Sequence, residues 1–357
     1  VGIIGCGNIA EPYARDIASY PQVDLVGVAD LEVERAQGLA EKYDCEAYAS
    51  NEALLADESV DLVVNLTIHH AHYDVVTQCL AAGKHVHSEK PLALTYEEAA
   101  QLVRLAEKKG LRLGCSPFTF MGEAQQTAWK AINEGRVGPV RAVYAEVNHG
   151  RIETWHPNPA PFYDVGALFD VGVYPLTIIT AMFGPARKVS AYGRVIYPDR
   201  VTYDGAPFHI DTPDFIVASV ELENGTLARL TTNFYVGKQG KQKGIEFHGD
   251  LGSLYLSSWQ SFAADVELAD YGGEYEPIPL LKPGYEGTEW GRAALDMAEA
   301  IEAGRPHRAT GEQAAHVVEI LCAIAESVEA GCTVDVHSSF SQPALMEWAC
   351  LLYTSPS

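Results

Sequence analysis

Short apolar runs alternate with helical patterns over the first third of the chain. Runs rich in β-branched residues occupy residues 1–5, 23–29, 61–66, 84–88 and 111–115. Amphipathic segments separate them, for example residues 96–109, which follow Thr95 and Glu98 in capping-box spacing and end before Gly110. Continuous apolar strands joined by helices are typical of a parallel sheet covered on both faces. The pattern predicts an α/β domain with a parallel sheet over residues 1–120.

The pattern changes after about residue 120. Strand-like runs follow one another without helices at residues 140–147, 188–196, 215–222, 226–234, 244–248 and 253–256. Asn224-Gly225, between two of these runs, is a strong signal for a tight hairpin. A helix returns after Thr310 and stops at Gly331. We expect an α+β domain over residues 121–340 with a large, mainly antiparallel open sheet, and we interpret residues 351–357 as a non-native or disordered tail.

Composition and charge narrow the class of partner. The 357 residues are 47% hydrophobic, and 48 acids against 25 bases give a net charge of −23. Nucleic acids and anionic membrane surfaces are disfavoured, because phosphate binding needs clustered Lys and Arg. No apolar run approaches the roughly 20 residues that span a bilayer. Seven scattered cysteines without a C-x-x-C pair indicate reduced thiols and a cytoplasmic protein.

The N-terminal stretch VGIIGCGNIAEPYA has the order strand, Gly-x-Gly-x-x-Ala, helix. This spacing allows a tight turn, close approach of a pyrophosphate, and close helix–strand packing. Asp30 lies 23 residues after Gly7, where an acid accepts hydrogen bonds from an adenosine ribose and repels a 2′-phosphate. NAD is therefore favoured over NADP, although the glycines alone would also fit a plain strand-to-helix turn. Residues 1–120 are therefore predicted to form a Rossmann NAD-binding domain. The expected cofactor contacts here are Gly5, Gly7, Asn8, Ile9, Ala10 and Asp30.

A second candidate site lies in GKHVHSEKPLA, residues 83–93. Glu89-Lys90-Pro91 directly follows a predicted strand, at the carboxyl edge where open parallel sheets bind ligands. A lysine there can donate to a substrate hydroxyl, and partial desolvation would lower its pKa toward a range useful for proton transfer. The alternative is a solvated lysine in an ordinary turn, and position alone does not decide between them.

These motifs, together with GALFDVGVYPL at residues 166–176, resemble the Gfo/Idh/MocA oxidoreductases over roughly residues 1–335. The resemblance implies that Lys90, Asp170 and Tyr174 are catalytic. Asp170 and Tyr174 are four residues apart, so on a helix both point to one side. Many members carry His where this chain has Tyr174. The remaining cofactor contacts that the resemblance implies are Thr67, His69, His72, Glu89 and Lys90, with Ile68-His69 replacing the usual Pro-Asn.

Five histidines near this region raise the question of a metal site: His69, His70, His72, His85 and His87. No Cys or acid completes an evident ligand set around them. The resembling family needs no metal. We therefore predict no metal and interpret His85 and His87 as packing residues.

The segment EVNHGRIETWHPNPAPFYDVG, residues 146–166, is rich in groups that bind polyols. Aromatic faces pack against the C–H side of a sugar while polar groups bind its hydroxyls. An alternative is a structured loop at a domain interface, and Arg151 could also signal an acidic or phosphorylated substrate. The expected substrate contacts are Lys90, Phe118, His149, Arg151, Trp155, His156, Tyr163, Asp170 and Tyr174.

The leading functional prediction is an NAD-dependent dehydrogenase acting on a secondary alcohol of a sugar, sugar derivative or cyclitol. One alternative is a glycoside-cleaving enzyme that oxidises the sugar transiently. Another is a nucleotide-sensing regulator, which the intact Lys90 and Asp170 count against. An open sheet with one apolar face needs a cover, so we also expect a homodimer or homotetramer formed through the C-terminal sheet.

Overall fold

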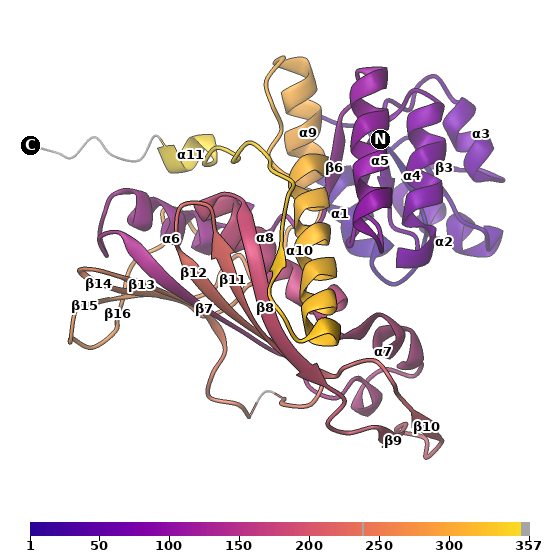
Figure 1. Cartoon of the computed structure of the whole chain (residues 1–357). Helices are drawn as coiled ribbons and strands as arrows, with labels where there is room; N and C mark the ends of the chain where they lie inside the picture. The colour runs from indigo at the N-terminus through magenta and orange to yellow at the C-terminus, as the bar shows by residue number, and fades with distance from the viewer. Residues whose placement is uncertain (238, 351–357) are drawn as a thin grey trace, which may run out of the picture. The chain divides into compact units, whose positions relative to one another are not determined.

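The computed structural model describes residues 1–237 and 239–350, and the predicted tail at 351–357 lies outside the described residues (Figure 1). The chain forms two compact units. The first contains residues 1–118 and 288–318, and the second contains the described residues of 119–287 and 319–350. Residues 288–318, which we placed in the second domain from the sequence, thus belong to the first unit.

The first unit is built on a six-stranded sheet in the order β3-β2-β1-β4-β5-β6. All neighbouring strands are parallel. This is the strand order of a doubly wound dinucleotide-binding fold, in which ligands bind where the order reverses, between β1 and β4. The predicted Rossmann domain is confirmed. Its strands are β1 (Gly2–Ile4), β2 (Gly27–Ala29), β3 (Glu46–Ala47), β4 (Leu62–Asn65), β5 (His85–Ser88) and β6 (Leu113–Cys115).

Helices of the first unit connect these strands, and one arrives from far along the chain. The Oγ atom of Thr95 accepts the N–H of Glu98 at 3.3 Å, so the predicted capping of α5 is confirmed. The late helix α9 joins this unit because the carboxylate of Asp16 accepts the N–H of Trp290 at 2.5 Å. The helices are α1 (Ala10–Ser19), α2 (Val33–Tyr43), α3 (Asn51–Ala56), the 3-10 turn η1 (His69–Ala71), α4 (His72–Ala81), α5 (Tyr96–Lys109) and α9 (Arg292–Glu302).

The second unit is built on a nine-stranded sheet in the order β16-β15-β14-β13-β7-β12-β11-β8-β17. It is mainly antiparallel, as predicted, but β7 and β12 pair in parallel. The hairpin at Asn224-Gly225 joins β11 to β12, with a positive φ of 87° at the glycine. The strands are β7 (Val140–Asn148), β8 (Ala186–Arg194), β11 (Phe215–Leu222), β12 (Leu227–Asn233), β13 (Gly244–Gly249), β14 (Gly252–Leu256), β15 (Val266–Asp270), β16 (Glu276–Pro277) and β17 (Val334–Asp335); β9 (Asp199–Val201) and β10 (Pro207–His209) pair separately.

Helices cover one face of the nine-stranded sheet, and the other face is open (Figure 1). Ser327 of α10 accepts the N–H of Ala191 in β8 at 2.9 Å on the covered side. Side chains of the central strands alternate between buried and more exposed positions, so the helix-covered face carries the core. The helical elements are η2 (Thr119–Met121), α6 (Glu123–Asn133), η3 (Ile152–Thr154), α7 (Ala160–Ala167), the π-helical turn η4 (Leu168–Gly172), α8 (Val173–Phe183), α10 (Gly311–Ala330, whose first turns belong to the first unit) and α11 (Glu347–Cys350).

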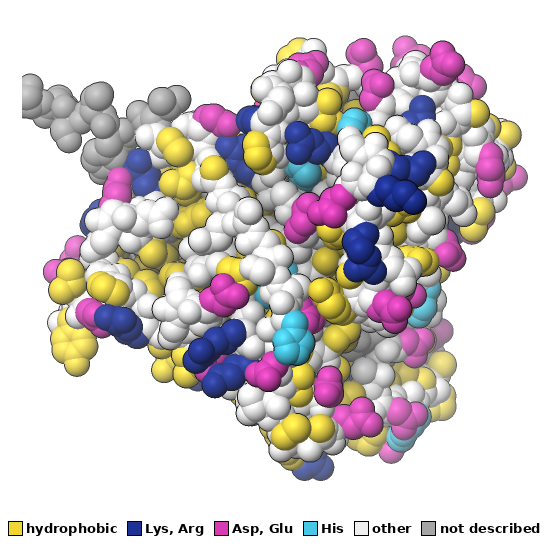
Figure 2. All heavy atoms as spheres, turned by 45° about the horizontal axis from the view of Figure 1, so that its top comes forward, with side chains coloured by type: hydrophobic (Ala, Val, Ile, Leu, Met, Phe, Trp, Pro, Cys, Tyr) yellow, Lys and Arg dark blue, Asp and Glu magenta, His cyan; other side chains and the backbone are white. Residues whose placement is uncertain are grey.

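One helical stretch, Ala160–Phe183, is long and apolar enough to cross a membrane by length and composition. The sequence shows no uninterrupted apolar run of this length, because Gly166 and Asp170 interrupt it. In the structure Gly166 has non-helical dihedral angles, which kink the stretch. Most of the stretch, 83% of the apolar window, is buried inside the protein, which is the behaviour of a core helix. On the face drawn in Figure 2, Lys and Arg side chains stand in small groups among acidic ones.

Candidate functional site

The glycine loop after β1 leaves space for a phosphate. Gly5 has a φ of +96°, and a Cβ there would lie 2.7 Å from the carbonyl carbon of Leu66, so only glycine fits this crossing with the end of β4. A Cβ on Gly7 would meet no atom within 4 Å. Helix α1 begins at Ala10, and Ile9 caps it without a side-chain hydrogen bond. The N–H of Ala10 donates to the carbonyl oxygen of Gly7 at 3.0 Å, and α1 presents the positive end of its helix dipole at this loop, as a dinucleotide pyrophosphate requires.

Asp30, at the end of β2, is tied to this loop. One carboxylate oxygen accepts the N–H of Cys6 at 2.6 Å, and the other accepts the N–H of Glu32 at 2.8 Å. Each oxygen keeps further lone-pair capacity for a ribose hydroxyl. Burial, with the charge of Asp30, raises the pKa of the Cys6 thiol to about 12, so this thiol stays protonated. The predicted ribose acceptor thus lies beside the predicted pyrophosphate loop.

The ends of β4 and β5 are linked by polar side chains. Asn65 donates to Ser88 at 3.0 Å and accepts from the hydroxyl of Thr67 at 2.7 Å. The buried ring of His72 lies 2.9 Å from the carbonyl oxygen of Thr67 and 2.7 Å from that of Pro91. Burial lowers the pKa of His72 while the two carbonyls oppose that shift. His72 therefore holds the segment after β4 against the turn after β5.

Glu89-Lys90-Pro91 forms a turn held by buried hydrogen bonds. Glu89 is 8% exposed, and one of its oxygens accepts the phenol of Tyr13 at 2.7 Å. Its other oxygen accepts the N–H of Lys90 at 3.1 Å. The Tyr13 hydroxyl also lies 2.9 Å from Oγ of Ser116, and the Lys90-Pro91 peptide is cis. Helix α1, strand β5 and the segment after β6 thus meet around Glu89, directly before the lysine, at the carboxyl edge of the sheet.

Two of the other histidines near this edge, His87 and His85, pack within the first unit, and His69 lies in the turn after β4. His87 is fully buried, with Nε2 3.2 Å from Oγ of Ser116, and burial lowers its pKa to about 3. His85 accepts the N–H of Arg112 at 2.8 Å. His69 lies half-buried in η1, its ring 4.4 Å from that of His70. Across residues 1–237 and 239–350, no group of three or more His, Cys, Asp or Glu side chains is arranged to hold a metal ion.

Phe118, a predicted substrate contact, is buried at the end of the first unit. Its side chain is 1% exposed, and its ring lies 5.7 Å from that of His87, edge to face. This contact places Phe118 in the packing around β5.

Asp170 and Tyr174 lie in the second unit, on consecutive helical segments. Asp170 is in the π-helical turn η4, and Tyr174 is in the first turn of α8. Their spacing of four would place both side chains on one side of a regular helix. Single π-helical turns occur often at functional sites, because they re-aim side chains within an otherwise regular helix. The buried ring of Tyr174 lies 4.9 Å from the ring of Trp259, which sequence reasoning did not single out.

Part of the predicted polyol-binding segment lines a cavity where β7 and β12 end. The cavity has a volume of about 750 Å³, and His149, Arg151 and Trp155 contribute to its wall. Trp155 is 53% exposed, with its ring 5.9 Å from His149 and 5.5 Å from His156. These residues therefore form one aromatic and basic cluster within the second unit.

Tyr163 has a structural role, contrary to the predicted substrate contact. It is buried, and its hydroxyl bonds to Glu153 and accepts from Arg200 at 2.7 Å. Arg200 is itself fully buried and contacts Glu153 at 2.9 Å and Asp214 at 2.5 Å. A buried arginine between two carboxylates is stable only when its donors are satisfied, and this network supplies the partners. Nothing in the local sequence pattern indicated that these distant residues would meet.

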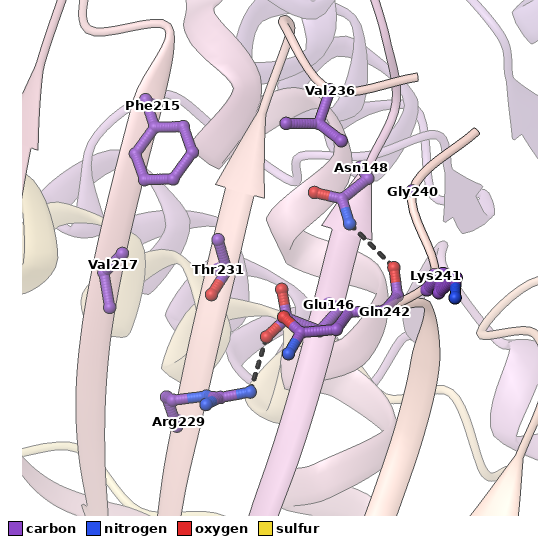
Figure 3. Close-up of a pocket in the computed structure, with 10 residues that line it drawn as sticks. All are labelled: Glu146, Asn148, Phe215, Val217, Arg229, Thr231, Val236, Gly240, Lys241 and Gln242. Atoms are coloured by element: carbon purple, nitrogen blue, oxygen red, sulfur yellow. Dashed lines mark hydrogen bonds and ion pairs between the residues drawn. The ribbon is translucent and has the colours of Figure 1, made fainter. Parts of the chain in front are cut away.

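A second, shallower hollow of about 410 Å³ lies on the open face of the nine-stranded sheet (Figure 3). Glu146 of β7 and Arg229 of β12 form an ion pair of 2.5 Å across it. Asn148 donates to the carbonyl oxygen of Gln242 at 2.8 Å. Figure 3 shows both interactions within the hollow, between side chains that come from neighbouring strands and the loop beside them. Because these polar side chains already have partners within the protein, we interpret the hollow as part of the sheet surface and not as a ligand site.

Comparison with known proteins adds a family to this geometry. Residues 1–116 match the model of an oxidoreductase family with an NAD-binding Rossmann fold, named GFO_IDH_MocA. Residues 125–255 match the GFO/IDH/MocA C-terminal domain.

Two curated relatives are similar over more than half of the chain. Trans-1,2-dihydrobenzene-1,2-diol dehydrogenase of Macaca fascicularis is 32% identical over 199 residues, 54% of this chain and 59% of that protein. The match thus spans about three fifths of that relative's length. A dTDP-3,4-didehydro-2,6-dideoxy-alpha-D-glucose 3-reductase of Streptomyces antibioticus is 31% identical over 230 residues, 61% of this chain and 67% of that protein.

Solved structures share the fold over nearly the whole chain. An NAD binding oxidoreductase from Klebsiella pneumoniae superposes with a TM-score of 0.84 at 21% identity, covering 95% of this chain and 99% of the other. An oxidoreductase from Desulfitobacterium hafniense, described as putatively NADPH-dependent, gives a TM-score of 0.81 at 19% identity, covering 94% and 97%.

Proposed function

The chain belongs to the Gfo/Idh/MocA oxidoreductase family, and we propose that it is an NAD-dependent dehydrogenase of sugars, sugar derivatives or cyclitols. The observation that carries the proposal is the turn at Glu89-Lys90-Pro91, fixed by buried hydrogen bonds beside the glycine loop of an NAD(P)-binding Rossmann domain. Ligands bind at the carboxyl edge of an open parallel sheet, so a lysine in this turn is placed to interact with a substrate. The two curated relatives are named as a diol dehydrogenase and a keto-sugar reductase, which supports an alcohol or carbonyl carbon as the reacting centre.

Each residue has a role that follows from its chemistry. A bound nicotinamide would supply the hydride acceptor. The ammonium of Lys90 donates a hydrogen bond to the reacting oxygen of the substrate and stabilises negative charge that develops there. Tyr174 receives the hydroxyl proton, and Asp170, four residues earlier, orients the hydroxyl. Glu89 is occupied by Tyr13 and by a backbone N–H, so it positions the lysine.

Replacing Lys90 tests the proposal directly. A panel of sugars and cyclitols, followed by NADH absorbance and by chromatography of the products, identifies a substrate. On that substrate, Lys90→Met lowers turnover by at least about a hundredfold, the usual scale of positioned acid–base catalysis, while the affinity for NAD stays nearly unchanged. Lys108→Met, which changes an exposed lysine on α5, is the matched control and keeps full activity.

Near-normal turnover of Lys90→Met would show that the turn has only a structural role. Sugar released from a glycoside without accumulation of NADH would point instead to transient oxidation of the substrate. Thermal melting of both variants checks that each is folded.

We further propose that Asp30 selects NAD over NADP. A carboxylate bonded to the loop leaves acceptors for ribose hydroxyls and repels a 2′-phosphate. Titration should show tighter binding of NAD, and Asp30→Asn should narrow the gap. The same substitution removes a charge that raises the pKa of Cys6, so alkylation of Cys6 at pH 8 should accelerate relative to the exposed Cys332. Equal affinities for NAD and NADP in the unmodified protein would refute the assignment.

We also propose that the protein is a homodimer or homotetramer through the open face of the nine-stranded sheet. Three large apolar side chains are exposed on neighbouring strands of this face: Tyr192 of β8 (67% exposed), Val217 of β11 (37%) and Leu227 of β12 (49%). Such a patch on an uncovered sheet favours association with a second copy. Light scattering should give a multiple of 38.7 kDa, and Val217→Glu should shift the mass toward one chain. A single-chain mass for the unmodified protein at micromolar concentration would contradict the proposal.

A further inference from the structure

The cavity at the ends of β7 and β12 lies where the two loops that follow these strands come close together. Gly150 has a φ of +84°, and a Cβ there would lie 3.2 Å from the Cα atom of Gly237. The loops after β7 and β12 therefore approach each other closely. The residues that line the cavity include His149, Arg151, Trp155, Tyr235 and Gln239.

Arg151 is held in place by two aromatic rings. Its guanidinium carbon lies 4.8 Å from the ring centre of Tyr197 and 4.9 Å from that of Tyr235. The two rings contact each other at 5.9 Å, inclined by 61°. An arginine stacked on aromatic faces is fixed in orientation, and its N–H donors lie along the edge of the plane. Arg151 is thus preorganised before any ligand arrives.

This arginine differs from its neighbour in its partners. Arg200 also stacks on Tyr197, at 5.2 Å, but its donors are satisfied by Glu153 and Asp214. Among the hydrogen bonds and ion pairs of residues 1–237 and 239–350, none involves the guanidinium of Arg151. The described residues that line the cavity include no acid, in a chain with 48 acids. The cavity therefore offers a half-buried positive charge that forms no ion pair with a carboxylate of residues 1–237 or 239–350.

We infer that this cavity binds the carboxylate or phosphoryl group of an anionic sugar derivative, with Arg151 as the charged anchor. Planar, bidentate recognition of such groups is the particular strength of a fixed guanidinium. The exposed face of Trp155 packs against the C–H side of the sugar, and Gln239 and Thr154 supply neutral polar groups at the wall. The inference names the substrate class of the proposed dehydrogenase and so rests on that function.

Binding measurements on the full chain with NAD test this assignment without requiring turnover. The probes are D-glucuronate and D-glucose 6-phosphate, with D-glucose as the neutral reference and inorganic phosphate as the sugar-free anion. Calorimetry should show at least one anionic sugar binding about tenfold or more tightly than glucose, the scale of one charge-assisted hydrogen bond. Whichever of the two binds more tightly identifies carboxylate or phosphoryl as the preferred group.

Three variants separate the role of Arg151 from general charge effects. Arg151→Gln should reduce the affinity for the anionic sugar to that of glucose, and Arg151→Lys should retain part of it. Arg141→Gln, which removes an exposed arginine paired with Asp250 outside the cavity, should leave it unchanged. If Arg151→Gln fails to fold, added KCl in the unmodified protein replaces it, because salt should weaken binding of the anionic sugar and not of glucose.

Equal affinity for glucose and both anionic sugars, or unchanged affinity in a folded Arg151→Gln, would overturn the inference. An NAD-dependent turnover of neutral sugars that survives Arg151→Gln would also overturn it while leaving the dehydrogenase intact. Selective, Arg151-dependent binding without any NADH formation would support the site and count against the dehydrogenase.

Discussion

The hydrogen bond from the phenol of Tyr13 to the buried carboxylate of Glu89, 2.7 Å long, couples the two halves of the cofactor edge. Tyr13 belongs to the helix that begins at the glycine loop, and Glu89 precedes Lys90 at the end of β5. A carboxylate this buried is tolerated only when its oxygens have donors, and both have them. The acid before the lysine is therefore an anchor for the turn that carries Lys90.

The second unit contains two arginines that differ in how their charge is paired. Arg200 and its two carboxylates are fully paired and buried, so they fix the loop that follows β7. Arg151 shares an aromatic ring with Arg200 but has no carboxylate among the described residues. A paired charge in this region stabilises the fold, and an unpaired one is left for a ligand. The proposed anion specificity follows from that difference.

Features fixed by local sequence could be predicted, and features fixed by distant contacts could not. The capped helix α5, the hairpin at Gly225 and the glycine loop depend on neighbouring residues, and the structure matches them. The two-residue strands β3 and β17 exist through their sheet neighbours, so no run of apolar residues marked them. A tyrosine can serve in a sugar-binding site or in a core, so the residue type of Tyr163 did not reveal its role. Its buried hydrogen bonds to Glu153 and Arg200, which are distant contacts, show that it belongs to the core.

The central claim is that the Tyr13–Glu89 bond positions Lys90 for chemistry, and Tyr13→Phe tests it by deleting one hydroxyl. The measurement is turnover on the identified substrate set against the affinity for NAD, with Tyr48→Phe, which loses a phenol bonded to Asp57, as the control. The account predicts a roughly tenfold or larger loss of turnover in Tyr13→Phe, an NAD affinity within about twofold of the original, and neither effect in Tyr48→Phe. Unchanged turnover in a folded Tyr13→Phe would contradict it.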